Sequence, residues 1–409
     1  MKLTFLGTAS CFPTPARGVS CTALTLDEGG VWLFDCGEGS QIQLQKCQNL
    51  RSGKVVKIFI THLHGDHLFG LPGLLCTLGN GCDVNTTEKI IDIYGPYGLR
   101  NYLITSLELS RSVPSLKFNV HELMPIKEQF PDDWSEWDTN FEYCGKSAAK
   151  VGEISFTKIY SSNLKALDIQ ISASNDDKDP LKSIIEESID DDNAIYWDVC
   201  SSNDSTYLVK AGALKHRIPS FGYVIIEKDK PGKLDVNRLQ KDYQLKPGPL
   251  YGQIKPGKVI EVGDGRKISS DDYLGPPKRG RKVSILGDTC DSSQLVCICK
   301  DSDLLVHEAT MENSLCIKAI EYGHSTPEMA ANFANLVNAK KLCLTHLSPR
   351  YKPHSRIIDK TQSSLEKIDA GLSADILKSE ADHYLQGIQN KMEVLIAEDF
   401  FVLPVIKMP

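Results

Sequence analysis

The chain has 409 residues, with 46 Lys and Arg against 53 Asp and Glu, a net charge of −7 and 41% hydrophobic residues. This length allows one large α/β domain with insertions or two smaller domains, and it excludes a short disulfide-stapled scaffold. The mild acidity argues against a general nucleic-acid coat protein, which carries a positive excess to replace counterions on phosphates. A nucleic-acid role would therefore need local basic patches.

The first apolar segment, MKLTFLGTAS, predicts a strand and lacks the basic and long apolar regions of a secretory signal. No segment approaches the roughly 18 apolar residues of a membrane-spanning helix, so no membrane contact is expected. The thirteen cysteines form no C-x-x-C pair, and their odd number precludes complete disulfide pairing. Reduced thiols indicate a cytoplasmic protein or a nuclear one. Cys297 and Cys299 are expected to face the core.

Residues 1–120 alternate apolar runs with Gly-rich turns, which predicts successive strands with a helix after some of them. The expected strands are MKLTFLG, CTALTL, VWLFDCGEG, KIFITHLHGDH and IIDIYGP.

The composition changes in the window 122–204, which has 19 acidic residues, 7 basic residues and no Arg. Its net charge of −12 leaves a remainder of 39 basic and 34 acidic residues, or +5. Long acidic runs are usually solvated and poorly ordered, so this window is expected to be an acidic, partly disordered insertion.

Two strands around a turn at Pro219 are expected next, followed by a segment of different composition. Residues 227–258 carry 8 basic and 4 acidic residues with several Pro and Gly, and they predict a protruding arm with a short helix near 235–243. The core then resumes with RKVSILGDT, DLLVHEAT, the helix HSTPEMAANFANLV, KKLCLTHLS and AEDFFVLPVI. Several strands thus end in loops bearing His or Asp, which is how α/β enzymes build sites.

The strongest chemical signal is the loop Thr61 to His67, which follows an apolar strand. His62 and His64 can bind one metal ion, while Asp66 and His67 reach a second. Neutral imidazoles and carboxylates suit Zn²⁺, with Mn²⁺ or Fe as alternatives. A polar loop with chance histidines is the competing interpretation.

Two metal ions need more ligands, and the later strand ends supply candidates. Asp288 can bridge both ions through its two oxygens, with His216 completing one site and His346 the other. Taken singly, each residue could equally be a cap or a buried hydrogen-bonding group. Their joint position after apolar strands favours the metal site.

The motifs HLHGDH, HRIPSFGY, GDT, HEAT, HSTPE and LTHLSPRY, in this order, resemble the metallo-β-lactamase superfamily and, within it, ribonuclease Z of the short ELAC type. The resemblance covers residues 1–120 and 205–409, including PGPLYGQIKPG in the arm. It implies an α/β protein with a four-layer αββα metallo-β-lactamase fold over residues 1–409, carrying the basic arm and the acidic insertion.

The resemblance also implies a zinc-dependent endoribonuclease with two Zn²⁺ per subunit, which removes 3′ trailers from precursor tRNA and leaves a tRNA 3′-hydroxyl. Action on terminal cyclic phosphates of tRNA is a further implied activity. Asp66 would orient or deprotonate the attacking water, and His324 would protonate the leaving oxygen. A capping box at 325–328 places His324 just outside a helix N-terminus, where a nearby acid must keep it protonated.

Glu308 is the candidate acid, and His307 beside it is a further catalytic candidate, although both could simply cap a strand-to-helix turn. Asp35 and Glu38 could support metal-bound imidazoles or form a polar turn.

The arm at 227–258 resembles the exosite that holds the tRNA elbow, with a solvated basic loop as the alternative. The basic cluster 278–282 could be a surface turn, a phosphate contact or a nuclear address. The resemblance implies a homodimer in which one subunit's arm holds RNA for the other's metals. Two rival functions remain: a small-substrate hydrolase of the same superfamily, and an RNA-binding scaffold with a relic site.

Overall fold

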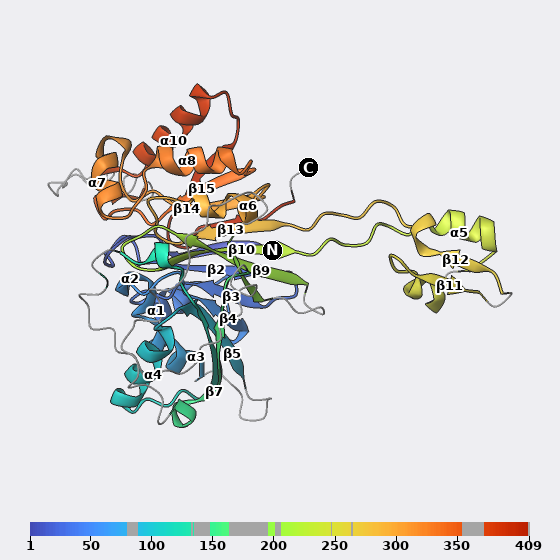
Figure 1. The fold of residues 1–409 in the computed structure, drawn as a ribbon, viewed down its shortest axis with the longest axis horizontal. Helices are drawn as coiled ribbons and strands as arrows, with labels where there is room; N and C mark the ends of the chain where they lie inside the picture. Colours follow the sequence, from blue (N-terminus) through green and yellow to red (C-terminus); the bar gives the residue numbers. More distant parts are fainter. Residues whose placement is uncertain are drawn as a thin grey trace.

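The fold was analysed in a computed structural model, which describes residues 1–79, 89–131, 134, 148–162, 195–200, 206–246, 248–262, 265–353 and 372–407. Two large sheets face each other and helices cover their outer faces (Figure 1). The N-terminal strand β1 and the C-terminal strand β19 pair antiparallel, with Leu3 opposite Leu403. These layers confirm the expected αββα architecture.

The first sheet has eight strands in the order β19-β1-β2-β3-β4-β5-β6-β7. Its strands are β1 (Lys2–Gly7), β2 (Cys21–Thr25), β3 (Val31–Phe34), β4 (Val55–Phe59), β5 (Ile90–Pro96), β6 (Lys117–Leu123), β7 (Glu153–Ile159) and β19 (Val402–Pro404). Strands β3 to β7 run parallel to one another, so their carboxyl ends meet at one edge.

The second sheet has seven strands in the order β18-β15-β14-β13-β10-β9-β8. They are β8 (Trp197–Cys200), β9 (Tyr207–Leu214), β10 (Ser220–Glu227), β13 (Lys282–Leu286), β14 (Leu304–Glu308), β15 (Lys341–Thr345) and β18 (Glu393–Ile396). Strands β13, β14, β15 and β18 are parallel, which again brings their carboxyl ends together.

Three hydrophobic cores separate the four layers. One core packs α1 (Ser40–Lys46), α3 (Leu71–Gly79) and α4 (Leu99–Ser110) on the outer face of the first sheet. A second packs α8 (Pro327–Leu336) and α10 (Asp375–Gly387) on the other sheet, together with α6 (Val296–Cys299). The third lies between the sheets and is rich in aromatic rings, as in the stacked Phe34 and Phe59 pair, whose centroids lie 4.9 Å apart. Burial of these apolar faces is the main stabilising contribution.

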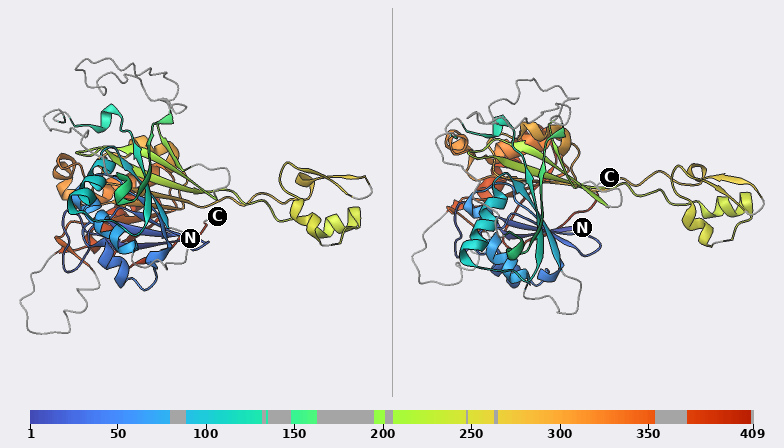
Figure 2. Two further views of the ribbon diagram at one scale, coloured as in Figure 1. Left: turned by 90° about the horizontal axis from the view of Figure 1, so that it is seen from below. Right: turned by 60° about the horizontal axis from the view of Figure 1, so that its bottom comes forward.

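The chain between β10 and β13 projects from the body as an arm with a small folded tip (Figures 1 and 2). The arm thus spans residues 228–281. It begins where the sequence predicted, but it ends well beyond the expected limit of residue 258. The tip contains α5 (Val236–Tyr243), β11 (Val259–Glu261) and β12 (Lys267–Ser269) around a small apolar core of its own. The two connecting segments pair at Lys230 and Lys278.

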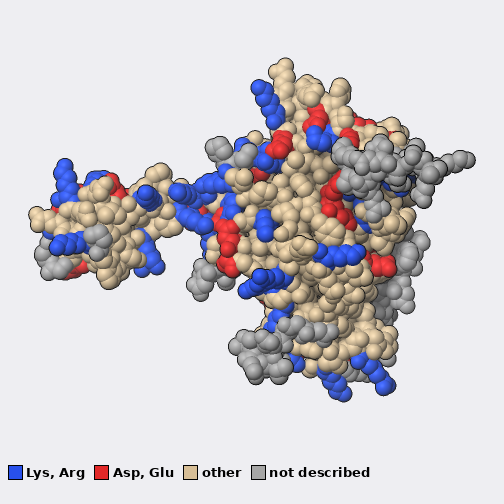
Figure 3. All heavy atoms as spheres, turned by 180° about the vertical axis from the view of Figure 1, so that it is seen from behind, with Lys and Arg blue, Asp and Glu red and all other residues tan. Residues whose placement is uncertain are grey.

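Ion pairs fix the base of the arm to the body. Arg281 forms a two-pronged contact with Glu227, with Nε to Oε2 at 2.7 Å and Nη2 to Oε1 at 3.1 Å, and it also contacts Asp27. Arg279 contacts Asp303 at 3.0 Å. Two cations of the basic cluster 278–282 are thus neutralised by carboxylates, which favours the surface-turn interpretation for them. Lys and Arg side chains along the connecting segments stay visible at the surface (Figure 3).

The described parts of the acidic window 122–204 include regular structure. Strand β7 forms an edge of the first sheet and β8 an edge of the second. The most acidic stretch, 176–192, lies outside the described residues. The expectation of two core-facing cysteines is half wrong, because Cys299 is buried and Cys297 is exposed. Among the described helices, none is long and apolar enough to cross a membrane.

Candidate metal centre and active site

Four loops that follow strand ends meet at the edge between the two sheets. The loop after β4 carries His62 and His64 and leads into α2 (Gly65–Leu68), which presents Asp66 and His67. The other ligand candidates follow β9, β13 and β15: His216, Asp288 and His346. The parallel strands explain this convergence, since their carboxyl ends share one edge.

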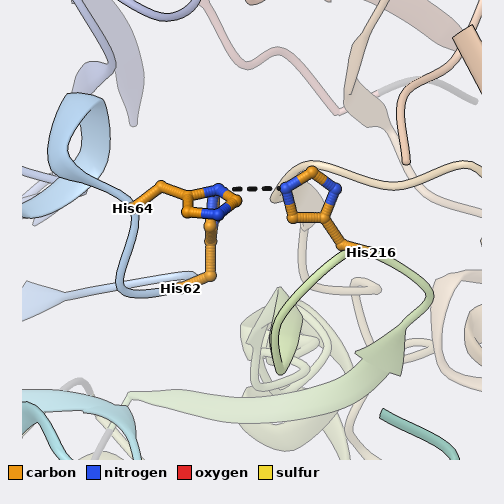
Figure 4. A group of neighbouring side chains, drawn as sticks. All are labelled: His62, His64 and His216. Atoms are coloured by element: carbon orange, nitrogen blue, oxygen red, sulfur yellow. Dashed lines mark hydrogen bonds between the residues drawn. The ribbon is translucent and has the colours of Figure 1, made fainter. Parts of the chain in front are cut away.

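The first ligand group consists of three imidazoles that point toward one another (Figure 4). His64 Nδ1 lies 3.1 Å from His62 Nε2 and 3.1 Å from His216 Nε2. Two of these side chains come from the first half of the chain and one from the second. The sequence left open which site His216 completes, and the geometry groups it with His62 and His64.

The second group contains Asp66, His67 and His346. The Nε2 atoms of His67 and His346 are 3.1 Å apart, and Asp66 Oδ2 lies 3.3 Å from His346 Nε2. The backbone N–H of Cys11 donates to the same Asp66 oxygen at 2.6 Å. No sequence pattern pointed to Cys11.

Asp288 joins the two groups. Its Oδ2 lies 3.6 Å from His62 Nε2 and 3.3 Å from His346 Nε2, and its Oδ1 lies 3.4 Å from His67 Nε2. The carboxyl is buried, and one side chain thus faces both ligand groups. This is the arrangement that a bridging carboxylate requires.

The donor atoms fit zinc. Zn²⁺ is bound by nitrogen at about 2.0–2.1 Å in tetrahedral geometry, which places neighbouring ligand atoms roughly 3.3 Å apart. The nitrogen pairs within each group lie 3.1 Å apart. These separations are close to the spacing expected of two ligands on one zinc ion.

Hydrogen bonds to the opposite ring nitrogens fix two of the candidate ligands in place. His67 Nδ1 donates to Asp35 Oδ2 at 2.7 Å, and His216 Nδ1 donates to the Gly323 carbonyl at 2.6 Å. Asp35 also accepts from the backbone N–H of Thr61 at 2.7 Å. Each bond leaves Nε2 free for a metal. Asp35 therefore supports a ligand, as one reading of the sequence allowed, whereas the exposed Glu38 lines the neighbouring pocket.

The electrostatics of the site differ from one donor to the next. Burial lowers the pKa of His64 to about 3 and that of His216 to about 4, so both imidazoles are neutral at physiological pH. Burial opposes ionisation of Asp288, but the neighbouring His346, His67 and His62 hold its pKa well below the ordinary value. Burial lowers the pKa of His67, but Asp288, Asp35 and Asp66 outweigh it and hold that pKa well above the ordinary value, so binding of a divalent cation there would release a proton.

His324 and Glu308 form a pair at the side of this cluster. His324 Nδ1 lies 3.0 Å from Glu308 Oε1 and 3.7 Å from Asp288 Oδ2. Burial lowers the pKa of His324, but the Glu308 carboxylate outweighs it and raises that pKa to about 9. His324 precedes the N-cap of α8, which is Thr326 rather than Ser325. A protonated imidazole is thus held beside the candidate metal ligands.

His307 is placed elsewhere, which corrects the expectation that it acts in catalysis. Its Nε2 lies 2.9 Å from Ser292 Oγ, its Nδ1 contacts the Glu308 carbonyl at 2.8 Å, and its ring packs against Phe333 of α8. Successive side chains of a strand point to opposite faces, so only one of His307 and Glu308 can face the cluster.

Thr310 is a residue whose role sequence reasoning missed, although it belongs to the HEAT motif. Its hydroxyl donates to Glu308 Oε2 and lies 3.0 Å from His346 Nδ1. Because a hydroxyl can donate once and still accept, Thr310 connects the ligand His346 to the carboxylate that holds His324.

Replacing Thr310 by valine is expected to lower kcat/KM for RNA cleavage by roughly 10- to 100-fold, because Glu308 and His346 both lose an orienting partner. Zinc affinity, measured by competition with a chelator, should weaken in the same variant. Thr310→Ser keeps the hydroxyl and is the matched control. An unchanged zinc affinity and rate in Thr310→Val would show that the hydroxyl orients neither residue.

Two facing sheets between helical layers, with this His and Asp cluster at their shared edge, define a metal-dependent hydrolase of the metallo-β-lactamase fold. The chain is 39% identical over 407 residues to zinc phosphodiesterase ELAC protein 1 of Homo sapiens, covering 99% of this chain and 98% of that protein. It is 38% identical over 358 residues to ribonuclease Z of Prochlorococcus marinus, covering 87% and 91%. The chain therefore belongs to the ribonuclease Z family of zinc phosphodiesterases.

Solved structures share this fold, and a family model matches the first part of the chain. The crystal structure of human tRNase Z, short form, matches with a TM-score of 0.60 and 31% identity and covers 100% of both chains. A long-form RNase Z from yeast shares the fold at a TM-score of 0.50 and 17% identity, over 99% of this chain and 42% of that one. The family model described as Anti-Pycsar protein Apyc1 matches residues 1–101, which include the metal-binding loop.

Proposed function

We propose that this protein is an endoribonuclease that removes 3′ trailers from precursor tRNA, leaving a tRNA 3′-hydroxyl and a 5′-phosphorylated trailer. Its membership of the ribonuclease Z family supports the substrate class. The structural observation that carries the proposal is the Glu308 and His324 pair beside two ligand groups joined by Asp288.

We propose that His62, His64 and His216 hold one Zn²⁺ and that Asp66, His67 and His346 hold a second, with Asp288 shared. Bound zinc supplies a nucleophilic water at neutral pH and offsets charge on phosphoryl oxygens. Asp66, whose Oδ2 accepts from the Cys11 N–H, would accept a hydrogen bond from the attacking water and orient it.

His324 supplies the proton that the leaving 3′-oxygen needs. Its Nδ1 is held by Glu308, so Nε2 is the nitrogen from which the proton is donated. With a pKa of about 9, His324 is protonated across the physiological range. Opening or removing a terminal cyclic phosphate on tRNA needs the same nucleophile and acid, so we extend the proposal to that reaction.

We further propose a homodimer in which the arm of one subunit holds RNA for the metals of the other, and a location in the cytoplasm or nucleus. The projection of the arm away from its own body supports the first proposal (Figure 2). The free thiols of the described cysteines support the second.

The two rival functions make different demands on the molecule. A small-substrate hydrolase has no use for the arm, whose segment 227–258 carries 8 basic and 4 acidic residues. A relic site in an RNA-binding scaffold would have lost ligands, yet all seven candidate ligands converge here. A preparation that holds less than about one tightly bound ion per chain would favour the scaffold.

Excising the arm is expected to abolish precursor tRNA cleavage while hydrolysis of a small chromogenic phosphodiester persists. The cut is best placed beyond the pairing of Lys230 with Lys278, joining the two segments by a short Gly-Ser turn, because that pairing and the Arg281 contact with Glu227 then keep the base intact. Both activities would be measured with zinc content. Equal loss of both would contradict an exosite role for the arm.

A further inference from the structure

The pocket beside the candidate metal centre is lined partly by residues that have no role in the proposed reaction. It has a volume of about 330 Å³ and is lined by Asp66, Asp288, His64 and His324 together with several residues that are not metal-ligand candidates. A phosphodiester entering this pocket carries a nucleotide on each side of the scissile bond. Those nucleotides must lie against the remaining walls, of which Phe69 and Arg217 are the exposed aromatic and cationic members.

Phe69 is an exposed aromatic ring in a fixed position. The side chain is 62% exposed although it directly follows α2, which presents Asp66 and His67. Its ring stacks on Tyr102 with centroids 6.3 Å apart and planes 21° from parallel. The ring also lies against Gly65, where an added Cβ would approach it to 2.2 Å. An ordered, exposed ring is a platform on which an unpaired base can stack.

Arg217 is an exposed cation in the loop between β9 and β10, which belong to the second sheet. In the part of the chain that the structure describes, no side chain or carbonyl forms a hydrogen bond or ion pair with its guanidinium. It lines the same pocket as His64 and His324. A guanidinium without a counter-ion is suited to bind a phosphate.

The backbone position of Arg217 is fixed by the neighbouring loop. Gly323, with φ of +74°, packs so closely that an added Cβ would lie 2.6 Å from His216 Nδ1 and 3.2 Å from the Arg217 backbone nitrogen. His324 follows Gly323 directly in the chain. Arg217 is therefore held on the side of the pocket where the leaving oxygen receives its proton.

We propose that Phe69 and Arg217 form a nucleotide clamp around the scissile phosphate. Arg217 binds the phosphate that precedes the last nucleotide of the tRNA, and Phe69 stacks on the first base of the trailer. The clamp rests on the proposed function, and it assigns to the site single-stranded nucleotides on both sides of the cut.

Phe69→Ala is expected to lower kcat/KM for precursor tRNA by roughly 10- to 100-fold, which corresponds to the loss of one stacked base. A substrate whose first trailer nucleotide is abasic should lower the wild-type kcat/KM by a similar factor and should make no further difference to Phe69→Ala. Phe69→Tyr keeps the stacking surface and should retain most of the activity. An equal loss for Phe69→Ala on both substrates would overturn the stacking role.

Arg217→Ala is expected to lower kcat/KM by roughly 10- to 100-fold, the cost of one charge-assisted hydrogen-bonded contact. A substrate with a neutral methylphosphonate before the last tRNA nucleotide should remove the difference between wild type and variant. Arg217→Lys should restore part of the loss. A full difference on the neutral substrate would overturn the phosphate assignment.

Controls separate the clamp from the function on which it rests. Leu109→Ala and Arg51→Ala change an exposed apolar and an exposed cationic residue outside this pocket, and both should behave as wild type. Melting temperature and zinc content show whether each variant is folded and loaded. If the wild-type protein cleaves no precursor tRNA, the proposed function fails, whereas cleavage without any substrate-dependent effect of the variants refutes the clamp alone.

Discussion

Replacing Asp288 by asparagine is expected to lower kcat/KM for precursor tRNA by more than about 100-fold, because residues that merely support a ligand already cost 10- to 100-fold. Asp288 faces His62 in one ligand group and both His67 and His346 in the other. An amide keeps the shape of the side chain but loses its charge. Zinc content per chain, measured by mass spectrometry, should fall together with activity.

The matched control is Asp291→Asn, since that carboxyl lies three residues further and accepts from the backbone N–H of Ser293. It should retain zinc and activity. If Asp288→Asn kept its full zinc content and rate, the two ligand groups would not share this carboxylate.

Replacing Glu308 by glutamine is expected to move the alkaline limb of the pH profile of kcat/KM toward lower pH. In the wild type the limb should lie near pH 9, because the Glu308 carboxylate raises the pKa of His324 to about 9 and the acid form persists up to that pH. Without that charge the pKa returns toward the ordinary value of about 6.5. At pH 8 the rate should then fall by about 30-fold, and at pH 6 much less.

His324→Ala tests the same proton donor by removing the imidazole itself. It should remove the alkaline limb altogether while zinc remains bound, since His324 belongs to neither of the two zinc-ligand sets proposed here. A Glu308→Gln profile that loses rate equally at all pH values would mean that Glu308 acts on the structure of the site and not on the proton of His324.

The metal ligands could be predicted from the sequence because their chemistry is local. His62, His64, Asp66 and His67 are adjacent in the chain, and each of the three distant candidates directly follows an apolar strand. Parallel strands bring such positions to one edge, so strand order alone accounts for the convergence. The alternation of apolar runs and Gly-rich turns predicted strands and helices, whereas the four-layer architecture was implied by the family resemblance.

Other features depend on contacts that a sequence does not show. Whether His307 or Glu308 faces the site depends on the register of β14, which places Glu308 beside His324. Thr310 and the Cys11 N–H act through hydrogen bonds between segments far apart in the chain. Composition marked the window 122–204 as acidic, yet β7 and β8 within it form edges of the two sheets, because strand pairing depends on backbone hydrogen bonds that composition does not show.

The central claim is tested most directly by incubating the pure protein with a 3′-extended precursor tRNA and mapping both product ends, alongside Asp66→Ala. The account predicts one cut at the end of the tRNA, a 3′-hydroxyl on the tRNA and a 5′-phosphate on the trailer, with the variant nearly inactive. Undiminished cleavage by Asp66→Ala, or products with the phosphate left on the tRNA, would contradict it.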